Sequence, residues 1–134
     1  MTTFTTQRRV EFCDTDMAGM MHFANFFRFM ESAEHDYLRS LGLSVIWNEA
    51  GQQLGFPRVS ASCDYLKPAH YQDMLDISVS VERICQKSVT FSFEFRRDQE
   101  VIALGRIATV CCKVTEGCVE SIAVPDSFRS KLTQ

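Results

Sequence analysis

The sequence predicts an α+β domain in which an antiparallel β-sheet packs against one long helix. Between residues 23 and 41, apolar residues recur at intervals of three and four, as on one face of an amphipathic helix. From residue 57 onward, apolar and polar residues instead alternate, as in strands that bury only one face. Because the strands are segregated from the long helix in the chain, we expect the helix to cover one face of the sheet.

The expected helix has one apolar stripe and ends at a glycine. The stripe contains Phe23, Phe26, Phe27, Met30, Ala33, Tyr37, Leu38 and Leu41, and the opposite face is polar. Gly42 follows directly, and glycine accepts the left-handed backbone of a helix C-terminus. Two carboxylates of the helix, Glu31 and Glu34, are expected to be solvated charges.

One strand is expected before the helix, at residues 4–12, and four or five after it, at residues 59–66, 75–82, 89–95, 101–114 and 119–124. The run 101–114 is the longest and most apolar, which favours a central position in the sheet. Residues 43–56 are expected to be irregular, with a short helical turn around Trp47. Glu116-Gly117 predicts a hairpin turn, and Pro125 predicts the start of a short terminal helix.

Composition narrows the class of protein. The 134 residues suffice for one domain, residues 1–134, and shares of 46% hydrophobic and 23% charged residues exclude a disordered chain. A net charge of −3 without a basic run argues against a nucleic-acid partner. No apolar stretch approaches the ~20 residues that span a bilayer, and no signal peptide is visible. We therefore expect a cytoplasmic protein without a membrane partner.

The six cysteines and three histidines do not suggest a metal or disulfide framework. No two cysteines form a C-x-x-C pair, so reduced thiols are expected. The histidines are too dispersed to form a metal site. The helix-free face of the sheet is too large for one short terminal helix, which predicts self-association.

The residues that suggest chemistry precede the long helix. Asp14 and Asp16 lie in a loop that leads into its first turn, where backbone N–H groups are unpaired and the helix dipole is positive. This arrangement can polarise a substrate carbonyl while a carboxylate attacks it or activates water. An aspartate before a helix also serves as a simple cap, and the residues alone leave both interpretations open.

The D-x-D-x-A-G pattern of residues 14–19, followed by aromatic-Ala-Asn-aromatic at residues 23–26, resembles the 4-hydroxybenzoyl-CoA thioesterase family. The similarity continues at residues 30–31, 37–43, 64–65, 68–69, 73, 82–83 and 87–88. It implies a hotdog fold, in which the sheet wraps around the helix, and hydrolysis of an acyl-CoA thioester. It also implies a homodimer or homotetramer that needs no cofactor, since coenzyme A belongs to the substrate.

The resemblance also implies roles for individual residues. Asp16 takes the place of the catalytic carboxylate, as nucleophile or general base, and the backbone N–H of Phe23 polarises the carbonyl. Gly19, which has no Cβ, lets the loop approach the substrate closely. Asp14 would orient the loop. Substrate contacts are implied for Asn25, Lys87 and Ser88.

The sequence departs from the family at two places. His22 stands where an aromatic residue is usual, and is either a catalytic helper for Asp16 or a residue of the helix start. The cationic cluster before the Lys-Ser pair is replaced by Cys85-Gln86, which leaves Lys87 as the phosphate contact.

Two other functions are compatible with a hotdog domain: a non-catalytic module that binds acyl-CoA, and a 3-hydroxyacyl-thioester dehydratase. The acyl group is either aromatic or a short to medium aliphatic chain.

Overall fold

A computed structural model describes residues 3–134. Its larger sheet is antiparallel and has five strands in the order β1-β5-β6-β7-β4. These are β1 (Phe4–Arg9), β5 (Met74–Ile84), β6 (Ser88–Arg97), β7 (Glu100–Val110) and β4 (Arg58–Tyr65). A smaller sheet has the order β2-β3-β8-β9, with β2 (Ile46–Glu49), β3 (Gln52–Gly55), β8 (Cys112–Thr115) and β9 (Cys118–Ser121). The helices are α1 (Asn25–Ser40), α2 (Asp126–Leu132) and the short 3-10 helix η1 (Phe12–Asp14).

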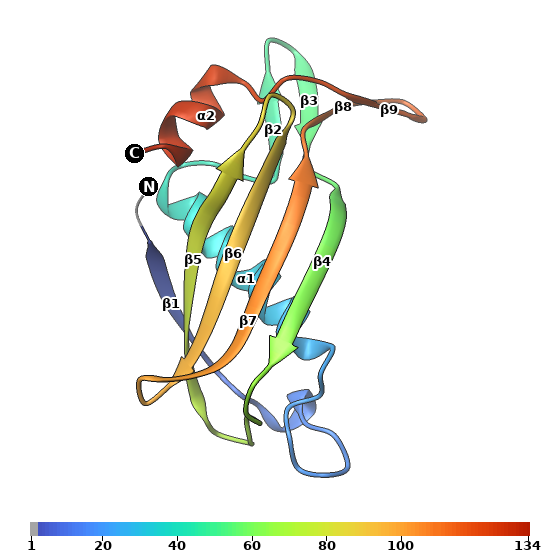
Figure 1. Cartoon of the computed structure of the whole chain (residues 1–134). Helices are drawn as coiled ribbons and strands as arrows, with labels where there is room; N and C mark the ends of the chain where they lie inside the picture. Colours follow the sequence, from blue (N-terminus) through green and yellow to red (C-terminus); the bar gives the residue numbers. More distant parts are fainter. Residues whose placement is uncertain (1–2) are drawn as a thin grey trace.

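The large sheet lies across α1, which runs behind it in Figure 1. The inward side chains of β5 and β6 are buried against the helix, and they alternate with outward polar residues as the sequence predicts. Phe91, Phe93 and Phe95 are each at most 2% exposed. The long helix and the antiparallel sheet of the expected hotdog fold are therefore confirmed.

Helix α1 ends as predicted but begins later. Gly42 has φ +75°, and the Leu43 N–H donates to the Leu38 carbonyl at 2.8 Å, which closes a Schellman-type cap. Phe23 precedes the helix and is 62% exposed, so its place in the apolar stripe was wrong. Phe29, which the stripe omitted, is buried instead.

Residues 43–56 contain a β-hairpin, so the expected irregular segment with a helical turn around Trp47 was wrong. The pairing of Glu49 with Gln52 leaves Ala50 and Gly51 as a two-residue turn, with φ of 51° and 79°. Two positive φ values define the type I′ turn that suits the twist of a hairpin.

The expected strand 101–114 is divided between the two sheets. β7 ends at Val110, and β8 begins in the smaller sheet after Cys111, whose N–H donates to the Lys87 carbonyl at 2.7 Å. The central strand of the large sheet is β6 rather than β7. No helix in residues 3–134 has both the length and the apolar character needed to cross a membrane.

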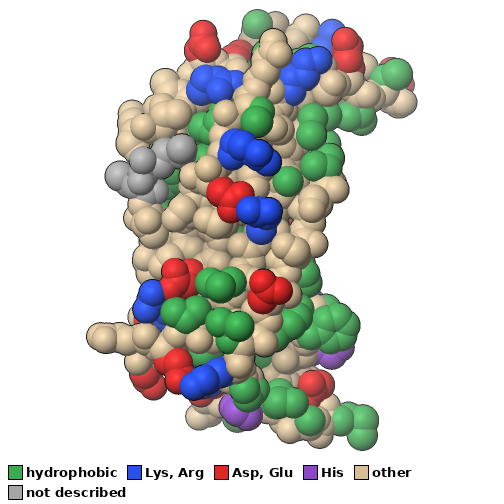
Figure 2. All heavy atoms as spheres, in the orientation of Figure 1, with side chains coloured by type: hydrophobic (Ala, Val, Ile, Leu, Met, Phe, Trp, Pro, Cys, Tyr) green, Lys and Arg blue, Asp and Glu red, His purple; other side chains and the backbone are tan. Residues whose placement is uncertain are grey.

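The outer face of the large sheet, on the side away from α1, is mainly polar across its middle, and Figure 2 shows hydrophobic side chains gathered toward its lower end. Serines of β5 and β6 lie on it beside ion pairs such as Arg106–Glu82, with Nη2 2.7 Å from Oε2. The polar part of this face needs no apolar cover, so the uncovered face is not by itself an argument for self-association, and the homodimer or homotetramer that the resemblance implies stays a prediction. The open edge of the sheet at β4 remains: most of its side chains are exposed, and it pairs with β7 on one side only.

Candidate active site

The loop between β1 and α1 is fastened to the segment between β4 and β5. The Val10 N–H donates to the Asp73 carbonyl at 2.9 Å, and the Met21 N–H donates to the Ala69 carbonyl at 2.7 Å. These backbone bonds fix the loop at the end of the sheet where β5 begins, at the bottom of Figure 1. The loop therefore has a defined position despite its exposure.

Asp16 is oriented by the backbone of its own loop. Its Oδ1 accepts hydrogen bonds from the N–H groups of Ala18 at 2.9 Å and Met20 at 3.2 Å. Gly19 has φ +80°, the left-handed conformation that favours glycine, so the bend depends on it. Within residues 3–134, the second oxygen, Oδ2, makes no hydrogen bond. One oxygen is thus held while the other is available for chemistry.

Asp14 shapes the same loop through its backbone and side chain. Its Oδ2 accepts from the Glu11 N–H at 2.9 Å, and its carbonyl accepts from the His22 N–H at 2.8 Å. The amide of Asn25 also donates to that carbonyl, at 2.9 Å. Asp14 therefore orients the loop, and the Nδ2 of Asn25 is engaged at the helix start. A substrate contact of Asn25 stays a prediction.

The turn that leads into α1 leaves an N–H group free. In the described part of the chain, no hydrogen bond uses the Phe23 N–H, which lies at the positive end of the helix. His22 stacks on the Phe23 ring with centroids 4.8 Å apart, and its Nδ1 accepts from the Ala24 N–H at 3.2 Å. The observed contacts of His22 thus serve the helix start, and within residues 3–134 none joins its side chain to Asp16.

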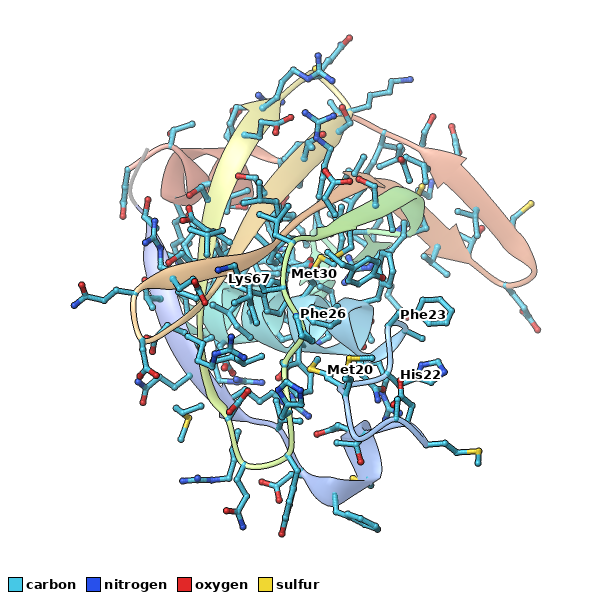
Figure 3. All side chains as sticks on the ribbon, turned by 60° about the horizontal axis from the view of Figure 1, so that its bottom comes forward. Met20, His22, Phe23, Phe26, Met30 and Lys67 are labelled. Atoms are coloured by element: carbon cyan, nitrogen blue, oxygen red, sulfur yellow. The ribbon has the colours of Figure 1, made fainter. Side chains whose placement is uncertain are left out.

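A cavity of about 320 Å³ adjoins these groups. Figure 3 shows Phe26 pointing toward the core from α1, whereas Phe23 and His22 project outward from the same segment near Met20. The lining comes from the loop, the start of α1 and the segment after β4: Asp16, Met20, Met21, Phe23, Phe26, Tyr65, Leu66, Lys67, Pro68 and Ala69. The volume lies at the lower end of the range for small-molecule pockets, and most of the lining is apolar.

The sequence analysis did not identify the segment after β4, which forms one wall of the cavity. Tyr65 ends that strand, and its hydroxyl donates to the Phe23 carbonyl at 3.0 Å. Burial raises the pKa of the Tyr65 phenol, so it remains a donor in neutral solution. The sequence did contain one signal for this wall: residues 64–65 and 68–69 are similar to the 4-hydroxybenzoyl-CoA thioesterase family. That similarity pointed to the segment after β4 but assigned no role to its residues.

Lys87 and Ser88 are not brought to this cavity within one chain. They lie at the turn after β5, whereas the Asp16 loop is fastened where β5 begins. β5 has 11 residues, so its ends are about 33 Å apart at 3.3 Å per residue. Figure 1 shows the β5–β6 turn at the top and the loop at the bottom. Arg129 holds this turn by donating to the carbonyls of Cys85 at 2.7 Å and Gln86 at 3.2 Å.

The two carboxylates of α1, Glu31 and Glu34, do not line the cavity. Both were expected to be solvated, which was wrong for Glu34. Glu34 is 1% exposed, and its oxygens meet the Arg58 guanidinium at 2.7 Å and 3.0 Å, whereas Glu31 is exposed as expected. Burial raises the pKa of Glu34, and the charge of Arg58 opposes that rise. Across residues 3–134, no three His, Cys, Asp or Glu side chains are grouped so as to hold a metal ion.

Comparison with known proteins identifies the relatives of this chain. Residues 10–132 match the family described as the Thioesterase-like superfamily. A curated relative from Aquifex aeolicus is 34% identical over 122 residues, which are 89% of this chain and 91% of the relative. A 1,4-dihydroxy-2-naphthoyl-CoA hydrolase of Synechocystis sp. is 30% identical over 136 residues, with 100% and 91% of the two chains covered.

A solved structure shows the same fold. The structure of a gentisyl-coenzyme A thioesterase superposes with a TM-score of 0.83 and 27% sequence identity. The superposition covers 96% of this chain and 99% of the other. The long helix and its curved sheet are therefore the hotdog arrangement of such proteins.

Proposed function

Because this chain belongs to the Thioesterase-like superfamily, we propose that it hydrolyses an acyl-CoA thioester to the free acid and coenzyme A, with Asp16 as the catalytic group. One observation carries the assignment to Asp16. Its Oδ1 is fixed by two backbone N–H groups, and the same cavity is bordered by Phe23. Among residues 3–134, neither the Oδ2 of Asp16 nor the N–H of Phe23 has a hydrogen-bond partner.

The chemistry follows from these two groups. The substrate carbonyl oxygen accepts from the Phe23 N–H, which stabilises the negative charge that develops on it. Asp16 either removes a proton from the attacking water or attacks the carbonyl carbon itself. The tetrahedral intermediate then expels the thiolate of coenzyme A, a good leaving group because thiols ionise several pH units below alcohols. If Asp16 is the nucleophile, this step leaves an anhydride between Asp16 and the acyl group, and water hydrolyses that anhydride to the free acid and the Asp16 carboxylate. No metal or redox cofactor takes part in this proposal.

The cavity supports an acyl group of limited size. Its apolar lining suits an aromatic ring or a short to medium chain, and two of the relatives above are named as a 1,4-dihydroxy-2-naphthoyl-CoA hydrolase and a gentisyl-coenzyme A thioesterase. A panel of benzoyl-, hydroxybenzoyl-, naphthoyl- and straight-chain acyl-CoAs, compared by kcat/KM, identifies the preferred class.

Self-association through β4 would place Lys87 of a second copy near the cavity, from which Lys87 of the same chain is distant. Two copies that pair edge to edge about a two-fold axis run their β4 strands antiparallel, so the start of one strand lies beside the end of the other. The end of β4 carries Tyr65 of the cavity, and its start lies toward the end of the molecule that bears the β5–β6 turn. Lys87 of the partner subunit would then contact the phosphates of coenzyme A. Light scattering measures the required dimer or tetramer.

The six cysteines are free thiols, which supports a reducing compartment such as the cytoplasm.

Asp16→Asn tests the proposed function. The asparagine Oδ1 can still accept the Ala18 and Met20 N–H groups, so the loop keeps its shape while the charge is lost. Loss of a general base lowers kcat by ~10²–10⁴-fold with little change in substrate binding. Asp14→Asn is the matched control, and it is expected to lose less turnover because Asp14 only orients the loop. Retention of more than about a tenth of the wild-type kcat by Asp16→Asn would refute the assignment.

The products separate the rival functions. Thiol release supports hydrolysis, an enoyl product without thiol release indicates a dehydratase, and binding without turnover indicates a non-catalytic module. Dehydration requires a histidine paired with an acid, and the Nδ1 of His22 is occupied by a backbone N–H. Single-turnover hydrolysis in ¹⁸O-labelled water distinguishes the two roles of Asp16, since only a covalent anhydride leaves label in its carboxylate.

A further inference from the structure

One peptide group at the start of α1 is bound by side chains at both of its polar atoms. The Tyr65 hydroxyl donates to the Phe23 carbonyl at 3.0 Å, and the His22 Nδ1 accepts from the Ala24 N–H at 3.2 Å. The carbonyl and the N–H belong to the same planar unit, the Phe23–Ala24 peptide. Tyr65 and His22 therefore hold this unit from its two sides.

Two backbone bonds of the same turn are long, whereas the Asn25 N–H donates to the His22 carbonyl at the usual 2.9 Å. The Phe26 N–H lies 3.4 Å from the Phe23 carbonyl, and the Phe27 N–H lies 3.2 Å from the Ala24 carbonyl. Both distances exceed the usual 2.9–3.0 Å. The turn also lacks a capping side chain at its N-cap, Ala24. The side-chain bonds of Tyr65 and His22 therefore supplement a turn that its own backbone holds only in part.

Tyr65 is well placed to act as a fixed point. Its ring packs edge-on against Phe26 with centroids 5.1 Å apart, and Phe26 packs in the same way against Phe95 of β6 at 5.2 Å. Its backbone is paired with Ala103 of β7. The hydroxyl is thus connected to the core of the large sheet, although part of the side chain is exposed.

We propose that Tyr65 and His22 are positioning residues that hold the Phe23–Ala24 peptide, and thereby aim the free Phe23 N–H at the reacting carbonyl. The inference rests on the proposed function, because the N–H needs aiming only where an oxyanion forms. Fixing the peptide plane that follows Phe23 fixes its ψ angle and stops the turn from rocking. His22 acquires a role in this way without touching Asp16.

The effect is expected in kcat. Removing an oxyanion donor outright costs about 10²–10³-fold. Loosening the donor while it is still present should cost less, about tenfold. KM should change less than about twofold, because a misaimed donor weakens the transition state more than the ground state.

Tyr65→Phe tests one half of the clamp, because it removes the hydroxyl and keeps the ring against Phe26. The expected result is a tenfold fall in kcat with KM nearly constant. Tyr71→Phe is the matched control: Tyr71 is 50% exposed near the same loop, and within residues 3–134 its hydroxyl makes no hydrogen bond. A wild-type kcat for Tyr65→Phe, or a raised KM with kcat unchanged, would overturn the proposal.

Two substitutions at residue 22 test the other half. His22→Ala should lower kcat to a similar extent. His22→Asn should restore most of it, because an asparagine oxygen can accept the N–H two residues later in an Asx-turn. In the double variant Tyr65→Phe/His22→Ala, the combined loss should be clearly smaller than the product of the single losses, since both act on one peptide. Equal loss in His22→Asn and His22→Ala would contradict a positioning role.

Amide hydrogen exchange provides a readout that does not need turnover. The Ala24 N–H should exchange faster in His22→Ala and in Tyr65→Phe than in the wild type or in Tyr71→Phe. Unchanged exchange in both variants would refute the clamp. If the wild type hydrolyses no acyl-CoA, the proposed function fails, and the exchange rates alone then decide whether the clamp exists.

Discussion

Replacing Arg58 by methionine should destabilise the protein in a manner that depends on pH. The Arg58 guanidinium is the ion-pair partner of Glu34, which is 1% exposed, with Nη2–Oε1 and Nη1–Oε2 distances of 2.7 Å and 3.0 Å. Methionine keeps an unbranched side chain but supplies no charge and no donor. The variant therefore leaves a carboxylate buried without its partner.

The sign of the pH dependence follows from the pKa of Glu34. Burial already raises that pKa above 4.5, and Arg58 opposes the rise. Without Arg58, burial and the nearby charge of Glu31 both raise it further. The folded variant then keeps a proton on Glu34 at pH values where the unfolded chain has lost it. The free energy of unfolding of the variant consequently falls as the pH rises from the pKa of Glu34 in the unfolded chain to its higher pKa in the folded chain. Above that range it stays low.

The magnitude at pH 8 should be large. Removing one partner of a buried ion pair costs about 3–5 kcal/mol. For a chain of this length that corresponds to a fall in Tm of roughly 10–25 °C. At pH 5 the loss should be clearly smaller, because protonation of Glu34 removes the unpaired charge.

Urea unfolding at pH 5 and pH 8 measures both values. Arg39→Met is the matched control, because the pair Arg39–Asp36 has side chains 74% and 39% exposed and should change stability by about 0.5 kcal/mol or less. The double variant Glu34→Gln/Arg58→Met should recover much of the loss. An equal loss at the two pH values would refute the reasoning.

Two further predictions concern substrate binding and packing. Lys87→Ala should raise KM with kcat nearly constant. In mixed dimers of Asp16→Asn and Lys87→Ala chains, one site combines an intact Asp16 with an intact Lys87 of the other chain, so it should show the wild-type KM. The absence of such sites would argue against a contact across the interface. Gly105→Ala should lower the free energy of unfolding by about 1–3 kcal/mol, as measured by urea unfolding. The added Cβ would lie only 2.4 Å from the Met30 Sδ beneath β7. An unchanged stability would show that Met30 moves aside freely.

The elements with a clear period were predictable from the sequence. Helix α1 and strands β4, β5 and β6 lie within a few residues of their expected bounds, because burial against one partner imposes a period of 3.6 or 2 on the chain. The position of Asp16 in a loop before the helix was also predictable, because it belongs to one continuous segment. The N–H of Phe23 was indicated only by the resemblance to the thioesterase family.

Features without a local signal were missed. The β2–β3 hairpin turns at Ala50-Gly51, and alanine at φ 51° is not a residue that predicts a type I′ turn. The run 101–114 is apolar throughout, and nothing in it marks Cys111 as the point where the chain passes to the second sheet. Glu34 lies next to the apolar stripe, four residues after Met30, but a carboxylate on a helix is usually solvated, and only the approach of Arg58 from β4 explains its burial.

The sequence by itself determined the class of fold, the helix and the loop that carries Asp16, because these depend on residues close together in the chain. Only the tertiary structure decided which distant residues meet. Tyr65 lies 42 positions after Phe23, yet it binds the Phe23 carbonyl because the end of β4 lies beside the start of α1. Lys87 lies at the far end of β5 from Asp16 because the course of the strand separates them. Strand order and register set such distances, and neither can be read from the periodicity of a single chain.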